Sequence, residues 1–587
     1  MILQQLYKDA PAILGEELPP PMYDRRPVRW VVELDDAGGF LGFTSLGGDA
    51  AKRKGIDRLV PYVGRTSGVR AILLADTPAY VFGKPAAPPR VDRNVAAKRA
   101  AFRDLVARCV DDTGEAAVRA VLAFLDAWSP ETHPLPEDMG DSDLVVFHVG
   151  DTWPADLPAV RDFWAGAARP EPAAGQAMVS QCLVTGRFGP VVQSMPGMVK
   201  GVPGGKSSGV ALVSANCEAF ESYGLERAET SPISAEAAER FTKALNRLIA
   251  GRRTHITLGQ SLVYVFWTSQ GADDETADLL DMPDEARVRD MLDSLRTGRR
   301  LTVRDDDPFH AFALSGSAGR AVVRDWLSTT VGEARRSLAA WFDAQRVVSP
   351  EGREERFFGV YPLAASLYRD ARKEMRPTVP RDLLLAALHR EPLPMALLER
   401  AVQRNRAEGR VTYPRAALIK AVLSLHRTEE PRPMAELDEA SAAPAYLCGR
   451  LLAELEAVQR TALGKTNVTI VGRYYGAASS APAVAFGVLL AHANKAHLPK
   501  IRKKSEPAYN ALQNRLAEIA APLKAFPTSL NLREQGLFSL GYYHQRAADR
   551  LAAKEAVERR ARGAATAEDA AVAEALADTD NTEDTDA

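Results

Sequence analysis

A glycine-rich stretch at residues 201–209, GVPGGKSSG, comes closest in this sequence to a motif that performs phosphate chemistry. In the phosphate-binding loop of nucleotide triphosphatases, a glycine is followed by four residues and then by Gly-Lys-Ser/Thr. Counted back from Lys206, that glycine would stand at position 200, where this chain has Lys200, and Gly201 is one place too close. The residues after the loop, VALVSA, predict a strand where the motif needs a helix. A nucleotide-dependent enzyme built on residues 201–209 is therefore an alternative rather than the favoured interpretation.

The polar side chains of this stretch suit contact with nucleic acid without catalysis. The glycines predict a hairpin loop whose amides, hydroxyls and ammonium groups reach phosphates or the edge of a groove. We therefore take Lys200, Lys206, Ser207 and Ser208 as candidate contacts to duplex DNA. A solvated turn without a ligand is the alternative that the residues leave open.

A second basic loop is predicted at residues 52–70, where cationic side chains, Arg58 and Arg70 among them, are interleaved with glycines. Because glycine lets the backbone approach a phosphate closely, this pattern predicts a reader of the sugar-phosphate backbone or of the minor groove. The candidate duplex contacts in this loop are Lys52, Arg53, Lys54, Arg65, Thr66 and Ser67.

A third basic segment, AHANKAHLPKIRKK, predicts a helix with Lys500, Lys503 and Lys504 on one face. A charge run is usually a solvated face, but here almost no acidic residue lies nearby to pair with the cations. We interpret it as a track for the backbone of a displaced DNA strand. The candidate contacts on this track are Arg473, Lys495, Lys500, Arg502, Lys503 and Lys504.

Two aromatic segments, RYYGAASSAP and EQGLFSLGYYHQR, lie in the same third of the chain. Their tyrosines either pack in a helical core, with the hydroxyls hydrogen-bonded, or stack on the bases of a single strand. The residues alone do not choose between these two roles.

The rest of the sequence offers few sets of residues that suit catalysis or metal binding. No HExxH or GxSxG motif occurs, and no histidine is followed by aspartate, so we expect no catalytic residue, no metal and no cofactor. The cysteines lie too far apart for a zinc ribbon or a disulfide framework, which favours a reducing cytosol. No apolar run approaches the roughly eighteen residues that span a bilayer, so we expect a soluble, cytoplasmic protein with no membrane partner. The cysteines are Cys109, Cys182, Cys217 and Cys448.

The formal net charge of -2 is unevenly distributed along the chain. The last twenty residues hold eight acidic residues and no base, so the remainder carries a net charge of +6. A small, acidic segment without aromatic residues cannot bury enough apolar surface to become ordered. We therefore expect a disordered acidic tail and a basic remainder that suits nucleic acid.

The apolar patterns predict an α+β protein with a β-rich N-terminal and central region followed by a C-terminal helical bundle. Strands are expected in VRWVVEL, GGFLGFTSL, AILLA, AYVFG, LVVFHV, QCLVTG, VALVSA and SLVYVFW, and two helices at 92–127. A further helix at 234–250 should begin after Ser234 as its N-cap. The predicted domains are 1–136 (β-rich module with two helices), 137–350 (mixed α+β), 351–435 (helical connector), 436–564 (helical bundle) and 565–587 (disordered tail).

Three blocks of the sequence, in order, resemble the large-subunit family of the subtype I-C CRISPR complex Cascade. The first is MILQQLYKDA with LPPPMYDRRPVRWVVELDDAGGFLG, which in the family is a helix leading to a strand that ends in Glu-Leu-Asp. The second is GVALVSANCEAFESYGLE, and the third joins AYLCGRLLAELEAVQ, RYYGAASSAPAVAF and FPTSLNLREQGLFSLGYYHQR. The chain departs from the family at residues 193–196, which lack a basic or histidine-bearing segment.

The resemblance implies a non-catalytic subunit of an RNA-guided antiviral DNA-surveillance complex. Such a subunit reads a protospacer-adjacent motif in double-stranded DNA, helps start R-loop formation and supports the displaced strand. The implied partners are the 5′ handle of a CRISPR guide RNA, target DNA, the Cascade backbone subunits and a helicase-nuclease. Small subunits from an internal start at or after Met434 are a further implied partner. A purely structural helical adaptor is the remaining alternative.

Overall fold

A computed structural model gives the fold and separates the chain into two compact units. Unit 1 comprises Met1–His255, Ser269–Ala272 and Ala313–Trp326, and unit 2 comprises Ile256–Thr268, Asp273–Phe312 and Leu327–Ala587. The residues that the structure describes are 2–15, 20, 22–47, 55–63, 68–85, 94–168, 179–192, 195–215, 217–221, 223–259, 262–270, 276–297, 305–350, 356–426, 431–464 and 468–562. The predicted acidic tail at 565–587 lies outside them.

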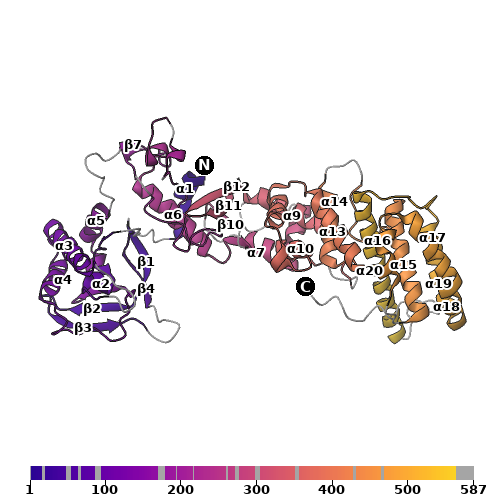
Figure 1. The fold of residues 1–587 in the computed structure, drawn as a ribbon, viewed down its shortest axis with the longest axis horizontal. Coiled ribbons are helices and arrows are strands. Elements are labelled where there is room, and N and C mark those ends of the chain that lie inside the picture. The colour runs from indigo at the N-terminus through magenta and orange to yellow at the C-terminus, as the bar shows by residue number, and fades with distance from the viewer. Residues whose placement is uncertain are drawn as a thin grey trace. The chain divides into compact units, whose positions relative to one another are not determined.

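Unit 1 is built around a four-stranded sheet with strand order β3-β2-β6-β5. Strand β2 runs parallel to β6 with Trp30 opposite Val145, and alternate apolar residues of both strands enter one core. Helices α3 and α4 contribute Phe102 and Phe124 to that core and cover one face of the sheet (Figure 1). These elements are β2 (Trp30–Leu34), β3 (Phe40–Ser45), β5 (Ala75–Asp76), β6 (Val145–Val149), α3 (Val95–Thr113) and α4 (Ala116–Ala127).

The remaining elements of unit 1 include the helix that supports the candidate site. Helix α6 begins after Ser234, whose Oγ accepts a hydrogen bond of 3.3 Å from the Ala237 N–H, which confirms the predicted N-cap. Helix α1 packs along α6. The elements are α1 (Ile2–Leu14), β1 (Tyr23–Val28), β4 (Ile56–Pro61), α2 (Pro78–Val81), α5 (Pro158–Ala167), β7 (Val179–Gln181), β8 (Phe188–Pro190) and α6 (Ala235–Ala250).

Some of the strands predicted from short apolar runs are wrong. AYVFG forms helix α2, because Pro78 occupies the first helical turn and the Val81 N–H donates to the Thr77 carbonyl at 3.0 Å. Only Ala75 of AILLA lies in a strand, with Leu73 and Leu74 in a turn before it, and QCLVTG leaves β7 after Gln181 to form a turn. VALVSA makes isolated bridges at Val210 and Ala211 and then bends. For VALVSA, the bridges join residues distant in sequence, Val199 and Arg320, which local pattern does not reveal.

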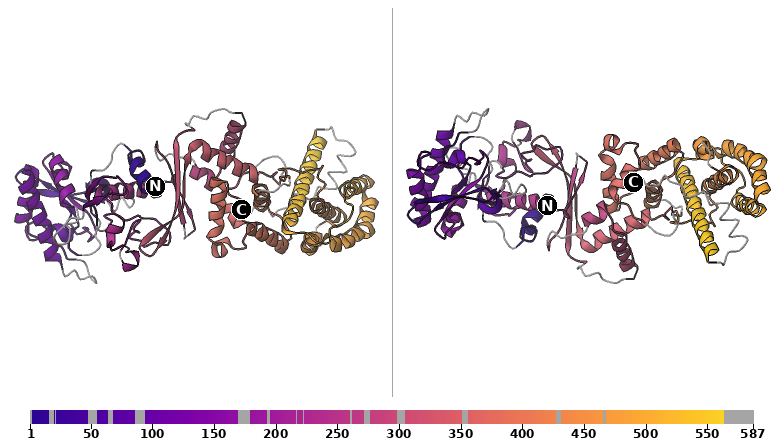
Figure 2. Two further views of the ribbon diagram at one scale, coloured as in Figure 1. Left: turned by 90° about the horizontal axis from the view of Figure 1, so that it is seen from above. Right: turned by 90° about the horizontal axis from the view of Figure 1, so that it is seen from below.

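A second four-stranded sheet has the strand order β12-β11-β10-β9. Residues Ala313–Trp326 of its β11–β12 hairpin belong to unit 1. Among the helices of unit 2, α15 packs against α20, the long yellow helix of Figure 2. The two helices approach closely at glycines. A side chain at Gly449 would overlap the Phe538 carbonyl, and one at Gly541 would overlap the Tyr446 carbonyl. The strands are β9 (His255–Leu258), β10 (Leu262–Thr268), β11 (Pro308–Ser317) and β12 (Arg320–Thr330). The helices are α7 (Thr276–Asp281), α8 (Glu285–Thr297), α9 (Val331–Gln345), α10 (Val360–Ala365), α11 (Ala371–Glu374), α12 (Thr378–His389), α13 (Met395–Glu408), α14 (Tyr413–Leu425), α15 (Pro444–Leu463), α16 (Ile470–Ala478), α17 (Pro482–His492), α18 (Leu498–Lys504), α19 (Glu506–Ala520) and α20 (Leu532–Ala561).

These elements confirm the predicted α+β class. The N-terminal and central regions carry the strands, and the described residues after Thr330 contain helices and loops without a strand. The predicted domain boundaries stay predictions. Across the described part of the chain, every helix is too short or too polar to cross a membrane.

Candidate nucleic-acid interface

A hairpin loop at residues 199–210 contains the glycine-rich stretch. Val199 and Val210 close its base by exchanging two backbone hydrogen bonds of 2.8 Å. Helix α6 fixes one side of this base through Asn246. The Asn246 side chain accepts a hydrogen bond of 2.9 Å from the Lys200 N–H and donates one of 3.0 Å to the Met198 carbonyl. The predicted hairpin thus exists and rests on a buried amphipathic helix.

The turn between β11 and β12 holds the other side of the hairpin. The Gly316 N–H donates a hydrogen bond of 2.7 Å to the Pro203 carbonyl. Just beyond the loop, the Ala211 N–H donates to the Gly319 carbonyl, and the Ala211 carbonyl accepts from the Ala321 N–H, each at 2.9 Å. The loop is therefore fixed on two sides, by the Asn246 side chain of α6 and by backbone hydrogen bonds to the β11–β12 turn.

Glycine is required where the hairpin meets this turn. Gly204 has a φ of +77°, and a side chain at that position would lie 2.9 Å from the Gly316 carbonyl oxygen. A side chain at Gly316 would overlap the backbone nitrogen of Gly205, and one at Gly205 would overlap a methyl group of Val210. The glycines thus serve close backbone packing here.

The tip of the hairpin presents the predicted polar residues to solvent. The Gly209 N–H donates to the Lys206 carbonyl at 2.9 Å, which makes Ser207 and Ser208 the central residues of a turn. Lys200, Lys206 and both serines are exposed. The structure therefore brings these four candidates together on one loop, where two ammonium groups and two hydroxyls can bind anionic oxygens or base edges.

The loop does not have the surroundings of a nucleotide-binding motif. Such a motif needs a helix that starts at the lysine and directs its amides at the phosphates. Here residues 206–209 form a turn, and the chain continues into the bridged residues Val210 and Ala211. The described geometry thus gives the nucleotide-dependent alternative no support.

Arg320 is a further cation beside the hairpin that the sequence did not suggest. It pairs with Ala211 in a parallel bridge, and its guanidinium lies 3.8 Å from the ring centroid of Phe220. This arrangement joins residues far apart in the sequence through the return of strand β12. Tyr223, with a φ of +57°, is exposed in the same segment, as are Phe220 and Leu225.

The second predicted basic loop, at 52–70, is interrupted by a strand, so that prediction is wrong as a single loop. Its named contacts Lys52, Arg53, Lys54, Arg65, Thr66 and Ser67 lie outside the described residues. Between them, β4 pairs antiparallel with β1. Arg58 of β4 lies 3.4 Å above the ring of Trp153 and forms an ion pair of 2.7 Å with Asp156. Its half-buried side chain and these two contacts make Arg58 a structural residue.

The third basic segment forms an exposed cationic surface on α18 and on the π-helical turn Ala493–His497 that precedes it. We call it the basic face of α18 and define it as Lys495, Lys500, Arg502, Lys503 and Lys504. Leu498 and Ile501 of α18 are buried, and all five cations are exposed. Arg502 lies 3.9 Å from a carboxylate oxygen of Glu506 and 5.5 Å from the ring centroid of Tyr509. Within the described residues, the four lysines form no ion pair. The predicted cluster is therefore assembled as an exposed cationic surface.

Arg473, the last predicted contact, lies on a different helix. It is exposed on α16, with its guanidinium 5.6 Å from the ring centroid of Tyr474. Helix α16 packs on α17, which leads to α18 through a π-helical turn at Ala493–His497. Arg473 is thus available to a ligand but is not part of the basic face of α18.

The aromatic residues between these helices belong to the core. Tyr475, Phe538 and Tyr542 are buried, and Tyr542 Oη donates a hydrogen bond of 2.8 Å to Glu456. Burial raises the pKa of both tyrosines above the ordinary value, so their hydroxyls stay protonated donors. Of the two roles left open by the sequence, core packing is therefore correct for these residues, and base stacking is wrong.

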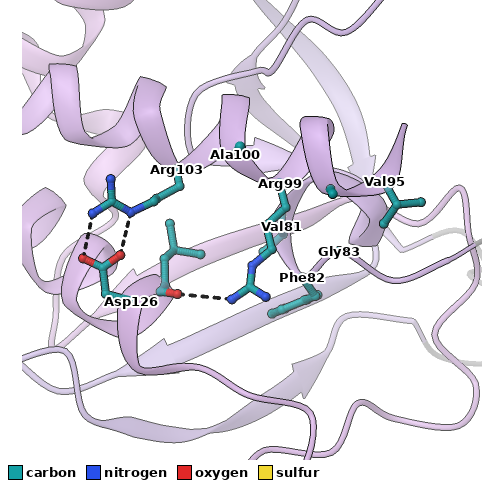
Figure 3. Close-up of a pocket in the computed structure, with 10 residues that line it drawn as sticks. Val81, Phe82, Gly83, Val95, Arg99, Ala100, Arg103 and Asp126 are labelled. Carbon is teal, nitrogen blue, oxygen red and sulfur yellow. Dashed lines mark hydrogen bonds and ion pairs between the residues drawn. The ribbon is translucent and has the colours of Figure 1, made fainter. Parts of the chain in front are cut away.

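A pocket of about 650 Å³ lies between α2, α3 and α4 (Figure 3). Its polar groups bond to one another: Arg103 makes two hydrogen bonds, of 2.7 and 3.1 Å, to Asp126. Arg99 donates to the carbonyls of Leu125 and Trp128 at 3.5 and 3.3 Å. The lining contains no pair of nucleophile and base, and the described residues hold no group of three or more side chains that suits a metal ion.

The hairpin and the basic face of α18 both lie within a family match that covers most of the chain. The family model described as CRISPR-associated protein (Cas_Csd1) matches residues 3–549. The chain belongs to this family. No curated protein matches it. Family membership confirms the CRISPR-associated character that the sequence blocks suggested, while the subtype and the residue roles stay predictions.

Proposed function

We propose that this chain is the non-catalytic large subunit of a subtype I-C RNA-guided DNA-surveillance complex. In this role it reads the protospacer-adjacent motif in double-stranded DNA and helps start R-loop formation. It also supports the displaced strand and helps recruit a helicase-nuclease. The observation that carries the proposal is the hairpin at 199–210, whose exposed Lys200, Lys206, Ser207 and Ser208 stand on a base held from two sides. Membership of the CRISPR-associated family supports it.

Rigid presentation is what a reader of a short motif needs. The guide RNA recognises the long target by base pairing, so the protein has to recognise only a few flanking base pairs and the shape of the duplex. A loop fixed by Asn246 and Gly316 places its donors without losing conformational freedom on binding. Arg320 adds a cation beside this loop for the phosphate backbone.

The basic face of α18 suits a different part of the bound DNA. Its five cations on one exposed surface provide phosphate contacts that are independent of sequence. Because Tyr475 and Tyr542 are in the core, the displaced strand would be held by charge rather than by stacking on these two rings. Arg473 on α16 extends this role to a neighbouring helix.

The proposed partners follow from the same role. The 5′ handle of the guide RNA and the backbone subunits would bind unit 1, and the helicase-nuclease would join after the R-loop forms. Small subunits from an internal start at or after Met434 would repeat the helices from α15 onward. Met434 is exposed and precedes α15, so such a product begins outside the helical core.

Binding by the assembled complex tests the proposal. The chain is combined with backbone subunits and guide RNA, and Kd is measured for duplexes that are identical except in the flanking motif. We expect tight binding to one motif and a loss of about 1–3 kcal/mol for each wrong base pair. A complex assembled without this chain is the control. Equal affinity for all flanking sequences, or full discrimination without the chain, contradicts the proposal.

A further inference from the structure

The basic face of α18 is strongly cationic and has little acid around it within the described residues. Lys495, Lys500, Lys503 and Lys504 form no ion pair there, and Glu506 lies 3.9 Å from Arg502 with both side chains more than half exposed. Cations this close together repel one another and attract any flexible anion within reach. The face therefore has a strong electrostatic preference that the folded helices leave unmet.

The chain itself carries a matching anion directly after its last helix. Helix α20 ends at Ala561, and residues 563–587 contain eight carboxylates and no lysine or arginine. Five of the eight stand in the last ten residues: Asp578, Asp580, Glu583, Asp584 and Asp586. The number of these carboxylates therefore equals the number of cations on the basic face of α18. The family match ends at residue 549, so this segment lies outside the matched region.

An ion pair between two helices shows that the segment can reach the face. Arg515 of α19 lies 3.2 Å from Asp549 of α20, and this pair sets a maximum path from Ala561 to Lys504. Along the two helices and across the pair, that path is about 50 Å, at 1.5 Å per helical residue. An extended chain covers about 3.3 Å per residue, so about fifteen residues suffice and about ten remain. The chain is therefore long enough for the five carboxylates at 578–586 to reach the face over a separation of this size.

We propose that residues 563–587 bind the basic face of α18 in the same molecule and compete there with the nucleic-acid backbone. The inference rests on the proposed function of this face as a strand track. A tethered segment acts at an effective concentration of about 1 mM, so weak ion pairs are enough to occupy the face. Free single-stranded nucleic acid then competes poorly with the acidic segment for the face. A strand that the R-loop delivers to the same face is tethered as well, and it displaces the acidic segment.

Cross-linking with a carbodiimide, which joins a carboxylate to an adjacent lysine, tests the docking directly. In the full chain at low salt, we expect links from carboxylates 568–586 to Lys495, Lys500, Lys503 and Lys504, found in the monomer and lost at about 0.5 M salt. Lys8 and the exposed Lys373 serve as comparison lysines. Cross-links to the comparison lysines as frequent as those to the basic face of α18 overturn the proposal. Cross-links found only in dimers also overturn it, because they indicate docking between molecules.

Binding of a single-stranded oligonucleotide of twenty thymidines tests the competition. The variant has all eight carboxylates of residues 568–586 replaced by Asn or Gln, and a scrambled segment of unchanged composition is the matched control. We expect the neutral variant to bind the oligonucleotide about tenfold more tightly at about 0.1 M salt. A tenfold change corresponds to a wild-type face that the acidic segment occupies about nine-tenths of the time. The scrambled segment should leave affinity unchanged, because charge rather than order carries the effect.

A combined variant separates this inference from the proposed function. The substitutions Lys500→Gln, Lys503→Gln and Lys504→Gln should weaken oligonucleotide binding and abolish the effect of the neutral segment. If they weaken binding while the neutral segment leaves it unchanged, the competition is wrong and the strand track stands. If they leave binding unchanged, the strand track is wrong, and the cross-links alone decide whether the segment docks.

Discussion

Val199 and Val210 exchange two backbone hydrogen bonds of 2.8 Å, and this pair closes the hairpin that carries Lys206. The pair turns a glycine-rich stretch into a loop with a fixed base. Without it, the stretch would be a flexible segment whose lysines sample many positions and lose entropy on binding. The position of the loop, rather than its composition alone, therefore makes it a candidate reader of DNA.

Adding a methyl group where the hairpin meets the β11–β12 turn should displace the loop. In Gly316→Ala the new side chain overlaps the backbone of Gly205, and we expect overpacking to cost about 1–3 kcal/mol of local stability. Affinity of the assembled complex for a duplex with the correct motif should fall about tenfold, which corresponds to about 1.4 kcal/mol. Gly319→Ala in the same turn has no atom within 4 Å and is the matched control. Equal effects of the two substitutions would argue against a positioned hairpin.

Removing the charge of Arg320 should weaken duplex binding without unfolding unit 1. Arg320→Gln deletes a cation beside the hairpin, and a charged hydrogen bond contributes about 1.5–3 kcal/mol. We expect at least a tenfold rise in the Kd of the complex for duplex DNA, with unchanged discrimination between motifs. The exposed Arg336, which pairs with Glu333 in unit 2, supplies the control Arg336→Gln. An unchanged Kd would remove Arg320 from the interface.

The strand track predicts a change in salt dependence. Each phosphate contact to a single strand contributes about 0.7 to the slope of log affinity against log salt concentration. The triple variant Lys500→Gln, Lys503→Gln, Lys504→Gln should therefore lower the magnitude of this slope by about 2. A control variant removes the same charge from Arg372, Lys373 and Lys524, which are exposed elsewhere in unit 2. A slope that falls equally in both variants would mean that binding follows net charge alone.

Much of the fold followed from sequence, because long periodic segments dominate it. The helices of the C-terminal third and the N-cap at Ser234 come from local patterns that survive in the structure. The short runs AYVFG and VALVSA did not, because one proline and two distant pairings decide their conformation. Other short runs, such as LVVFHV in β6, did form the predicted strands, so length alone did not decide the outcome.

The candidate site was predictable only where its residues are consecutive. Lys200 to Ser208 and Lys495 to Lys504 are each clusters along the chain, so their composition revealed them. Arg320 reaches the hairpin through the pairing of Ala211 with β12, which no local pattern contains. The tyrosines at 475 and 542 were ambiguous because burial, not residue type, decides whether an aromatic ring packs or binds.

A buried carboxyl group between α15 and α20 predicts a pH dependence of stability. Glu454 is fully buried, accepts a hydrogen bond of 3.0 Å from Gln545 and lies 3.6 Å from Arg515. Burial, and then the charge of neighbouring Asp549, raises its pKa well above the ordinary value. Since the folded pKa is the higher one, the folded state holds the proton more tightly. The stability from this group is complete below about pH 4.3 and is lost as the pH rises through the folded pKa.

Glu454→Gln should remove this pH dependence. Gln retains the shape and a donor toward Asp549, so we expect the Tm of the variant to fall less than that of the wild type between about pH 5 and pH 8. Thermal unfolding at several pH values measures this, and Glu518→Gln on the exposed side of α19 is the control. Parallel Tm curves for Glu454→Gln and the wild type would show that Glu454 does not hold its proton in the folded protein.

Motif discrimination by the hairpin is the most direct test of the account. The double variant Lys200→Gln, Lys206→Gln is assembled with backbone subunits and guide RNA, and its Kd is measured for duplexes with correct and incorrect flanking motifs. We predict that the ratio of the two Kd values falls by at least tenfold relative to the wild-type complex, while binding of a single-stranded target to the guide is unchanged. A double variant with the wild-type ratio would contradict the assignment of motif reading to residues 199–210.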